Sequence, residues 1–306
     1  MQSGSSTERH SPRYGGIDAW SPRDVLDTML EAQFAAVGAV QAALPAIEAA
    51  ALAIEARLRG PGRLVYCGAG TSARLAAQDG AELTPTFSWP AERVLVLPAG
   101  GAAALVRSVE GAEDAIETAA ALVREHRLGA ADVLIAIAAS GTTPFTLACL
   151  RAAGRAGALS VGVANNRDTP LLSDAEHPIL LDTGAEPIAG STRMKAGTAQ
   201  RIALNLLSSL VMIRLGRVYQ GLMVDVQAVN AKLVKRSRTI LKQLTGHEET
   251  SIEIALRRAE GNVKLAFLLL EGCDLDEAER LLDRSGGHLG AARELARDRH
   301  RRKKRA

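Results

Sequence analysis

Short apolar runs alternate with helical stretches between residues 64 and 181, and this alternation constrains the fold more than any other feature. Each run has the length of a buried strand, and most of the segments between them have helical character. Continuous apolar strands separated by helices are typical of a parallel sheet covered on both faces. The sequence therefore predicts an α/β domain with a doubly wound, five-stranded parallel sheet. The expected strands are Leu64–Cys67, Val94–Leu97, Val133–Ile137, Ser160–Val163 and Ile179–Leu181.

Helical patterns surround these strands. A helix is expected from Ser21, and the Ala-rich run 33–59 is expected to break or kink near Pro45, because proline lacks the N–H that a helix interior needs. A further helix is expected over 102–125. The last segments are expected to form a small C-terminal helical bundle, with glycines between its helices. The helices expected after the last strand are Ser191–Leu215, Met223–Leu244, Glu249–Arg258, Asn262–Leu270, Asp274–Asp283 and His288–Arg297.

Four segments follow from this pattern. Residues 1–20 are expected to be a flexible N-terminal segment, and 21–245 to hold the α/β domain with its flanking helices. Residues 246–298 form the helical subdomain, and 299–306 form a basic tail. The tail could touch nucleic acid or an anionic surface, but we expect a solvated terminus. Aromatic residues make up only 3% of the chain, which argues against a base-stacking surface, so we do not expect a nucleic-acid partner.

The cysteine and leader patterns indicate a cytoplasmic protein. Three widely spaced cysteines form no disulfide framework or metal-ligand pattern, and the six histidines have no metal-ligand spacing. The polar N-terminus lacks the apolar region of a secretory signal, and the chain has no uncharged apolar run of 18 residues. We therefore expect neither a membrane partner nor a metal.

Two strand exits carry similar glycine and hydroxyl patterns. GAGTS at 68–72 follows the first strand, and ASGTTP at 139–144 follows the third. Glycine lets the backbone approach a ligand, while Ser and Thr hydroxyls and free helix N–H groups favour an anion. The other interpretation is ordinary helix capping, but two such loops at equivalent exits favour a phosphate site. The glycine spacing matches neither a dinucleotide loop nor a Walker loop.

Two acidic residues, and two basic residues at a predicted helix start, are further candidates for catalysis or ligand binding. Glu82 and Glu113 each have the pattern of a surface charge, but two carboxylates beside a phosphate site could serve as general acid and base. Arg193 and Lys195 lie where a helix is expected to begin. Cations there oppose the helix dipole unless an anion is near, which favours a ligand-facing or dimer-facing role.

These residues resemble those of a known family. The two loops are similar to those of the sugar isomerase (SIS) fold. Further segments resemble the N-acetylmuramic acid 6-phosphate etherase family, which is related to the glucokinase regulatory protein, and the resemblance covers nearly the whole chain. Those segments are TERHSPRYGGID at 7–18, ELTPTF at 82–87, EGAED at 110–114, GSTRMKAGTAQ at 190–200, LMVDVQAVNAKL at 222–233 and RSGGHLGAAREL at 284–295.

The resemblance implies a carbon–oxygen lyase of cell-wall amino sugar recycling. Such an enzyme cleaves the D-lactyl ether of N-acetylmuramic acid 6-phosphate, giving N-acetylglucosamine 6-phosphate and D-lactate, without metal or organic cofactor. It implies a homodimer, with Glu82 as proton donor and Glu113 as the second acid. The residues expected to bind the sugar phosphate are Gly70, Thr71, Ser72, Ser140, Gly141, Thr142, Thr143, Ser191 and Lys195.

The chain departs from the family pattern at two loop positions. Ala73 stands where the family usually has glycine, and Thr142 stands where it usually has arginine. A change in substrate affinity or specificity is expected from the second. Two alternatives use the same loops: a non-catalytic sugar-phosphate sensor that regulates a partner protein, and a sugar-phosphate isomerase.

Overall fold

The structure is a computed structural model that describes residues 5–226 and 231–303. The chain divides into two compact units, which are considered one at a time below. The first unit comprises residues 1–81 and 91–210, and the second comprises residues 82–90 and 211–306.

A five-stranded parallel sheet forms the centre of the first unit. The strand order is β2-β1-β3-β4-β5, so the chain winds outward from β1 in both directions. The buried apolar runs explain this sheet, because β1, β3 and β4 are covered on both faces. The predicted doubly wound sheet is confirmed. The strands are β1 (Leu64–Gly68), β2 (Val94–Pro98), β3 (Val133–Ile137), β4 (Leu159–Ala164) and β5 (His177–Leu180).

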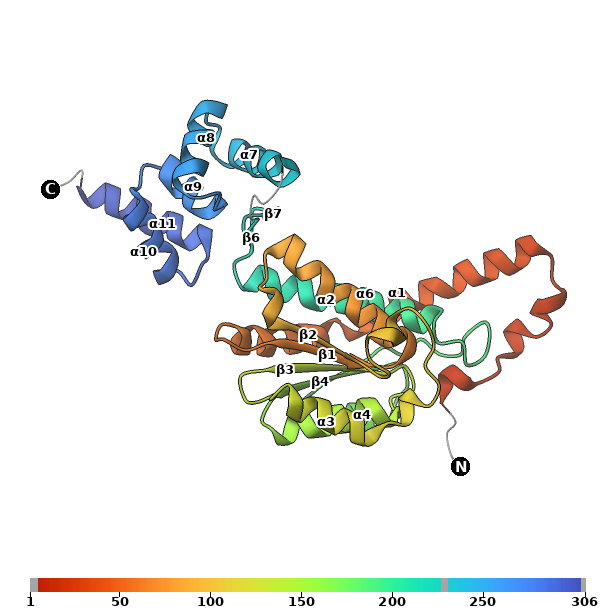
Figure 1. The fold of residues 1–306 in the computed structure, drawn as a ribbon. Helices are drawn as coiled ribbons and strands as arrows, with labels where there is room; N and C mark the ends of the chain where they lie inside the picture. Colours follow the sequence, from red (N-terminus) through yellow and green to blue (C-terminus); the bar gives the residue numbers. More distant parts are fainter. Residues whose placement is uncertain (1–4, 227–230, 304–306) are drawn as a thin grey trace. The chain divides into compact units, whose positions relative to one another are not determined.

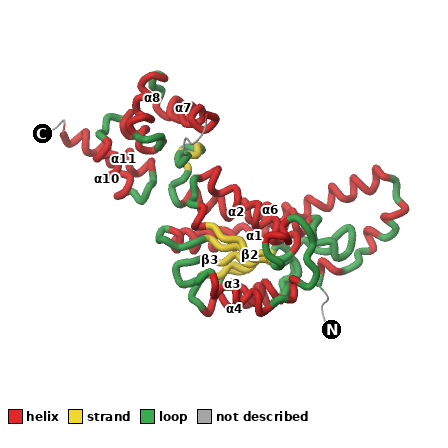
Figure 2. The backbone as a smooth tube through the Cα atoms, viewed as in Figure 1, coloured by secondary structure: helices red, strands yellow, loops and turns green. Residues whose placement is uncertain are grey.

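Helices cover both faces of the sheet (Figure 1). Helices α3 and α4 lie on one face of the sheet, and helices α2 and α6 lie on the other. Helix α1 contacts β3, β4 and β5. Figure 2 shows the strands as one layer between these helices. The helices are α1 (Pro22–Leu58), α2 (Gly70–Phe87), α3 (Ile116–Glu125), α4 (Pro144–Arg155), α5 (Pro170–Asp174) and α6 (Lys195–Arg214).

Helix α1 runs without interruption for 37 residues, so the predicted break near Pro45 is wrong, while the alternative of a kink there stays a prediction. Pro45 is exposed, while Ala43, Ile47 and Ala50 are buried. Water can satisfy the carbonyl that loses its partner on the exposed side, and packing of the buried side holds the helix straight enough to continue.

Helix α1 is also long and apolar enough to cross a membrane by length and composition alone. The core helix of a soluble protein passes the same test, and α1 packs against the sheet. Its outer side nevertheless exposes Leu26, Leu30, Phe34 and Val37, with exposed fractions between 53% and 70%.

The prediction of a helix over 102–125 is wrong for the first half of this range. Two short 3-10 turns, Ala102–Leu105 and Ala112–Asp114, precede α3. Gly101 and Gly111 stand immediately before these turns with φ of 69° each. A positive φ interrupts a right-handed helix, and the second turn carries Glu113.

The N-terminal segment folds back onto the first unit. Its described part forms three 3-10 turns, Ser6–Glu8, Pro12–Tyr14 and Ile17–Ala19, and buries Thr7 and Tyr14. The flexibility expected for residues 1–20 is therefore not what residues 5–20 show, while residues 1–4 lie outside the described part.

The second unit is helical, and the predicted C-terminal bundle is confirmed. A small hairpin, β6 (Val218–Tyr219) and β7 (Leu222–Met223), precedes the helices. Asn262 and Asp274 cap two of them by accepting N–H hydrogen bonds. The helices are α7 (Ala231–Thr245), α8 (Glu249–Arg258), α9 (Val263–Leu270), α10 (Leu275–Arg284) and α11 (Leu289–Lys303).

Two predicted segments of this unit have different bounds in the structure. The helix expected from Met223 begins at Ala231, because Leu222–Met223 pair as a strand; residues 227–230 of that expectation lie outside the described part. The basic tail is helical as far as Lys303, and residues 304–306 are not described.

A partly buried ion pair joins Arg63, immediately before β1, to Asp132, immediately before β3. The Arg63 guanidinium donates to both carboxylate oxygens of Asp132, at 3.0 and 2.7 Å, and the N–H groups of Arg63 and Gly129 donate to the same carboxylate. Burial raises the pKa of Asp132, but these hydrogen bonds outweigh it, so the pKa lies below its ordinary value of 3.8.

This depressed pKa predicts a contribution to acid stability. The carboxylate stabilises the fold above the unfolded pKa of 3.8, and that contribution is lost as the pH falls through the lower folded pKa. Urea unfolding between about pH 2 and pH 6 should show a shallower acid loss of unfolding free energy for Asp132→Asn than for wild type. Equal acid slopes would contradict this assignment.

Candidate active site

Loops that follow β1, β3, β4 and β5 meet at the carboxyl edge of the sheet, because parallel strands end on the same side. This edge is where open parallel sheets bind ligands. Most of the predicted site residues lie in these loops, within the first unit.

The first loop turns directly from β1 into α2. A Cβ on Gly68 would lie 2.8 Å from the carbonyl oxygen of Ile137, so only glycine fits beside β3. Gly70 has a φ of 52° and begins the helix. The first N–H groups of an α-helix have no partner within the helix, so they favour an anion at this loop. Thr71 is half-buried, and Ala73 is buried in the helix.

Glu113 reaches the first loop from the turn before α3. Its Oε1 atom lies 3.5 Å from the position that a Cβ would take on Gly70. The side chain is exposed and makes no hydrogen bond or ion pair with another described residue. The structure thus brings a predicted carboxylate together with a predicted phosphate loop, although 43 positions separate Glu113 from Gly70.

The backbone of the loop after β3 requires glycine at position 141. Gly141 has a φ of 70°, and a Cβ there would lie 2.3 Å from the hydroxyl oxygen of Thr169. The Thr142 N–H donates to Ser140 Oγ at 3.2 Å, and Ser140 Oγ lies 3.4 Å from Thr143 Oγ1. Thr142 is exposed. Helix α4 then starts without a side-chain cap, so this loop also offers hydroxyl and N–H donors.

A buried chain of side chains connects the first loop to β4. Ser72 Oγ donates to Gln200 Oε1, Gln200 Nε2 donates to Asn165 Oδ1, and both of these bonds are 2.9 Å long. Asn165 Nδ2 donates to the Leu181 carbonyl oxygen. The last bond fixes the orientation of both amides, so the Ser72 proton is used inside the protein. In this geometry Ser72 has no proton to donate to a ligand.

Glu186 was missed by the sequence interpretation and supplies the anion that α6 needs. Its carboxylate accepts from the N–H groups of Lys195 and Ala196, at 3.2 and 2.9 Å, and only 1% of the residue is exposed. Burial raises the pKa of Glu186. The free N–H groups at this helix start are thus satisfied by the chain itself. Nine residues separate Glu186 from the helix start, which is too far for a local capping pattern to show.

Lys195 and Ser191 lie at the same edge. Lys195 is buried, and burial lowers the pKa of its ammonium, which makes no hydrogen bond or ion pair with a described residue. Ser191 is half-buried, and Arg193 is exposed. These positions fit a ligand-facing role, which stays a prediction.

Glu82 lies near the end of α2 and is exposed. It belongs to the segment 82–90 of the second unit, whereas Glu113 belongs to the first. A joint action of the two carboxylates therefore stays a prediction from the resemblance.

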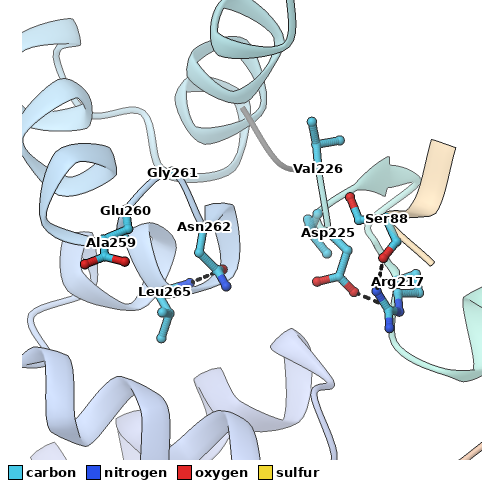
Figure 3. Close-up of a pocket in the computed structure, with 10 residues that line it drawn as sticks. Ser88, Arg217, Asp225, Val226, Ala259, Glu260, Gly261, Asn262 and Leu265 are labelled. Atoms are coloured by element: carbon cyan, nitrogen blue, oxygen red, sulfur yellow. Dashed lines mark hydrogen bonds and ion pairs between the residues drawn. The ribbon is translucent and has the colours of Figure 1, made fainter. Parts of the chain in front are cut away.

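The second unit holds a cavity of about 460 Å³ between the β7 strand end and the turn before α9 (Figure 3). Arg217 donates to the carbonyls of Phe87 and Ser88, forms an ion pair with Asp225 at 3.2 Å, and lies over the Trp89 ring. None of the predicted site residues lines this cavity. Its lining is Ser88, Arg217, Val224, Asp225, Val226, Ala259, Glu260, Gly261, Asn262 and Leu265.

The chain is similar to several known proteins. Residues 46–154 match the family model described as the glucokinase regulatory protein N-terminal SIS domain. Relatives named N-acetylmuramic acid 6-phosphate etherase are 50% identical in Deinococcus radiodurans, over 92% of this chain and 93% of the relative, and 45% identical in Streptomyces coelicolor, over 94% and 93%. A phosphoheptose isomerase structure from Francisella tularensis is 19% identical with a TM-score of 0.49, covering 63% of this chain and 100% of its own.

The backbone conformation of Gly141 predicts that a substitution at this glycine destabilises the fold more than a substitution at an unstrained glycine. Gly141→Ala should lower the unfolding free energy by at least about 2 kcal/mol, because the left-handed backbone disfavours a side chain and the Cβ meets Thr169. Gly154→Ala, in open space on α4, should be neutral or stabilising. Urea denaturation measures both, and equal effects would contradict the prediction.

Proposed function

This chain belongs to the N-acetylmuramic acid 6-phosphate etherase family, and we propose that it cleaves the D-lactyl ether of N-acetylmuramic acid 6-phosphate. The products would be N-acetylglucosamine 6-phosphate and D-lactate. The observation that carries the proposal is the position of the Glu113 carboxylate against Gly70, in the loop best suited to a phosphate.

The substrate phosphate is proposed to bind between the starts of α2 and α4. Both helices begin at glycine-containing loops, and the N-cap side chain of α4 makes no capping hydrogen bond, whereas the start of α6 is closed by Glu186. The proposed donors are the free N–H groups and the hydroxyls of Thr71, Thr142 and Thr143. Ser72 and Ser140 support the two loops from within. Ser191 and Lys195 complete the proposed site, with Lys195 supplying positive charge.

The reaction needs protons to be moved at three points. The open-chain sugar has a C1 aldehyde, which acidifies the C2 proton. A carboxylate removes that proton, lactate leaves from C3 with a proton from an acid, and water adds across the C2–C3 double bond. We assign the proton donation to Glu82 and the second acid–base role to Glu113. This route uses no metal or organic cofactor.

The proposed setting is the cytoplasm, where the enzyme would recycle cell-wall amino sugars. A non-catalytic sensor or a sugar-phosphate isomerase would use the same loops. In a non-catalytic sensor, Glu113 would have no catalytic role beside the ligand. An isomerase would release no lactate, so product analysis separates the three candidate functions.

The two acids can be tested against an adjacent control. Glu113→Gln and Glu82→Gln should each lower kcat for D-lactate release by about 100-fold or more, because each removes an acid–base group. Glu110→Gln changes an exposed acid in the same segment and should keep wild-type activity. Lactate release is measured from N-acetylmuramic acid 6-phosphate. Wild-type protein that releases none would refute the etherase function, and full activity of Glu113→Gln or Glu82→Gln would refute its role.

Lys195 predicts a pH dependence of binding. Burial lowers the pKa of Lys195 below 10.5, so its positive charge is lost at a lower pH than that of an ordinary lysine. A phosphate monoester is already dianionic above about pH 7. Affinity for N-acetylglucosamine 6-phosphate should therefore fall as the pH rises toward 10.5, and Lys195→Met should show a weaker, pH-independent affinity. Calorimetry at several pH values measures this, and parallel profiles would contradict it.

We also propose that the protein is a homodimer that covers the outer side of α1. Leu26, Leu30 and Phe34 are spaced four residues apart, which places them on one helix face. Solvent contact of this face is unfavourable, and a second copy would remove it from water.

Sedimentation velocity tests this assembly. Phe34→Glu should convert a dimer into a monomer, because a charge would be buried in the apolar contact. Ala35→Glu, at an exposed neighbouring position on another side of α1, should leave the dimer intact. A wild-type monomer, or a dimer that survives Phe34→Glu, would rule out this interface.

A further inference from the structure

The short segment Ser5–Glu8 reaches the carboxyl edge of the sheet. Thr7 is completely buried, with 0% exposed, although it is polar and close to the start of the chain. Figure 1 shows this start of the chain in red, beside the green loop that follows β5. A buried hydroxyl must be hydrogen-bonded, so the partners of Thr7 indicate what the segment does.

Asn166 is the first partner, and all the hydrogen-bonding positions of its amide are used. Its Oδ1 accepts from Ser6 Oγ at 2.8 Å and from the Thr7 N–H at 3.2 Å. Its Nδ2 donates to Thr7 Oγ1 at 3.0 Å and to the carbonyl oxygen of Ala139 at 2.8 Å. Ala139 immediately precedes Ser140, so this amide ties the N-terminal segment to the third-strand loop.

The second partner is the loop before α6. The Gly190 N–H donates to the Thr7 carbonyl oxygen at 3.0 Å. The Glu8 carboxylate lies over the same glycine, with Oε2 2.8 Å from the position of a Cβ on Gly190. Gly190 immediately precedes Ser191. One residue, Thr7, is therefore hydrogen-bonded toward two loops that carry proposed phosphate-binding residues.

We propose that Thr7 is a positioning residue that clips the loop 139–143 to the loop 190–195 and so sets the spacing of the substrate site. The clip rests on the proposed function for the identity of its ligand. Thr7 itself touches no substrate. Without its hydroxyl, Asn166 Nδ2 loses one buried hydrogen bond, and Thr7 keeps only its main-chain bonds to Asn166 and Gly190.

The test compares Thr7→Val, which keeps the side-chain volume, with Thr7→Ser, which keeps the hydroxyl. Thr7→Val should raise KM, and the Kd for N-acetylglucosamine 6-phosphate, about fivefold, as expected for one hydrogen bond, with kcat within about twofold of wild type. Thr7→Ser should restore both values. Thr118→Val, at an exposed position on α3, is the matched control and should match wild type.

Hydrogen exchange of the free protein adds a readout that needs no ligand. Amides of 139–143 and 188–194 should exchange faster in Thr7→Val, while those of α8 and α9 should be unchanged. A lower Tm with unchanged Kd and unchanged loop exchange would show a merely structural role and overturn the proposal. If Thr7→Val does not fold, Ser6→Ala, at a half-buried position, decides by the same measurements. Lack of lactate release by wild type would refute the proposed function alone, because loop exchange still tests the clip.

Discussion

Two adjacent asparagines at the end of β4 hold the carboxyl edge of the sheet together. Asn165 connects, through Gln200, to the first loop and also bonds the carbonyl beyond β5. Asn166 bonds the third-strand loop and Thr7. Both amides are buried, and unmade hydrogen bonds there would cost about 1–3 kcal/mol each. The loops that face the proposed ligand therefore depend on one dipeptide that itself faces inward.

Charge at this edge is organised by burial as well as by pairing. Glu186 closes the start of α6, whereas α4 begins without a capping hydrogen bond from its N-cap side chain. An anion at the start of α4 would therefore meet free N–H groups, and Lys195 adds a buried ammonium at the start of α6.

The strands and the C-terminal helices were predictable because their signals are local. Apolar runs such as Val133–Ile137 occur at their predicted positions, and the C-terminal helices lie between the glycine breaks. Pro45 misled because tertiary packing of α1 outweighed the local rule. The loop glycines and Glu113 were singled out from sequence, and their roles toward a ligand stay predictions. Glu186 and Thr7 were not singled out, because their partners lie nine and 159 positions away and no local pattern encodes such contacts.

The link between Thr7 and Asn166 has a consequence for biosynthesis. Thr7 is synthesised well before its partners Asn166 and Gly190. The strands of the sheet can begin to associate as they emerge, yet the N-terminal segment must wait for residues near the end of the first unit. A truncated or still-growing chain thus lacks a closed ligand edge. The ligand-binding edge of the sheet can therefore be completed only after all five strands have been synthesised.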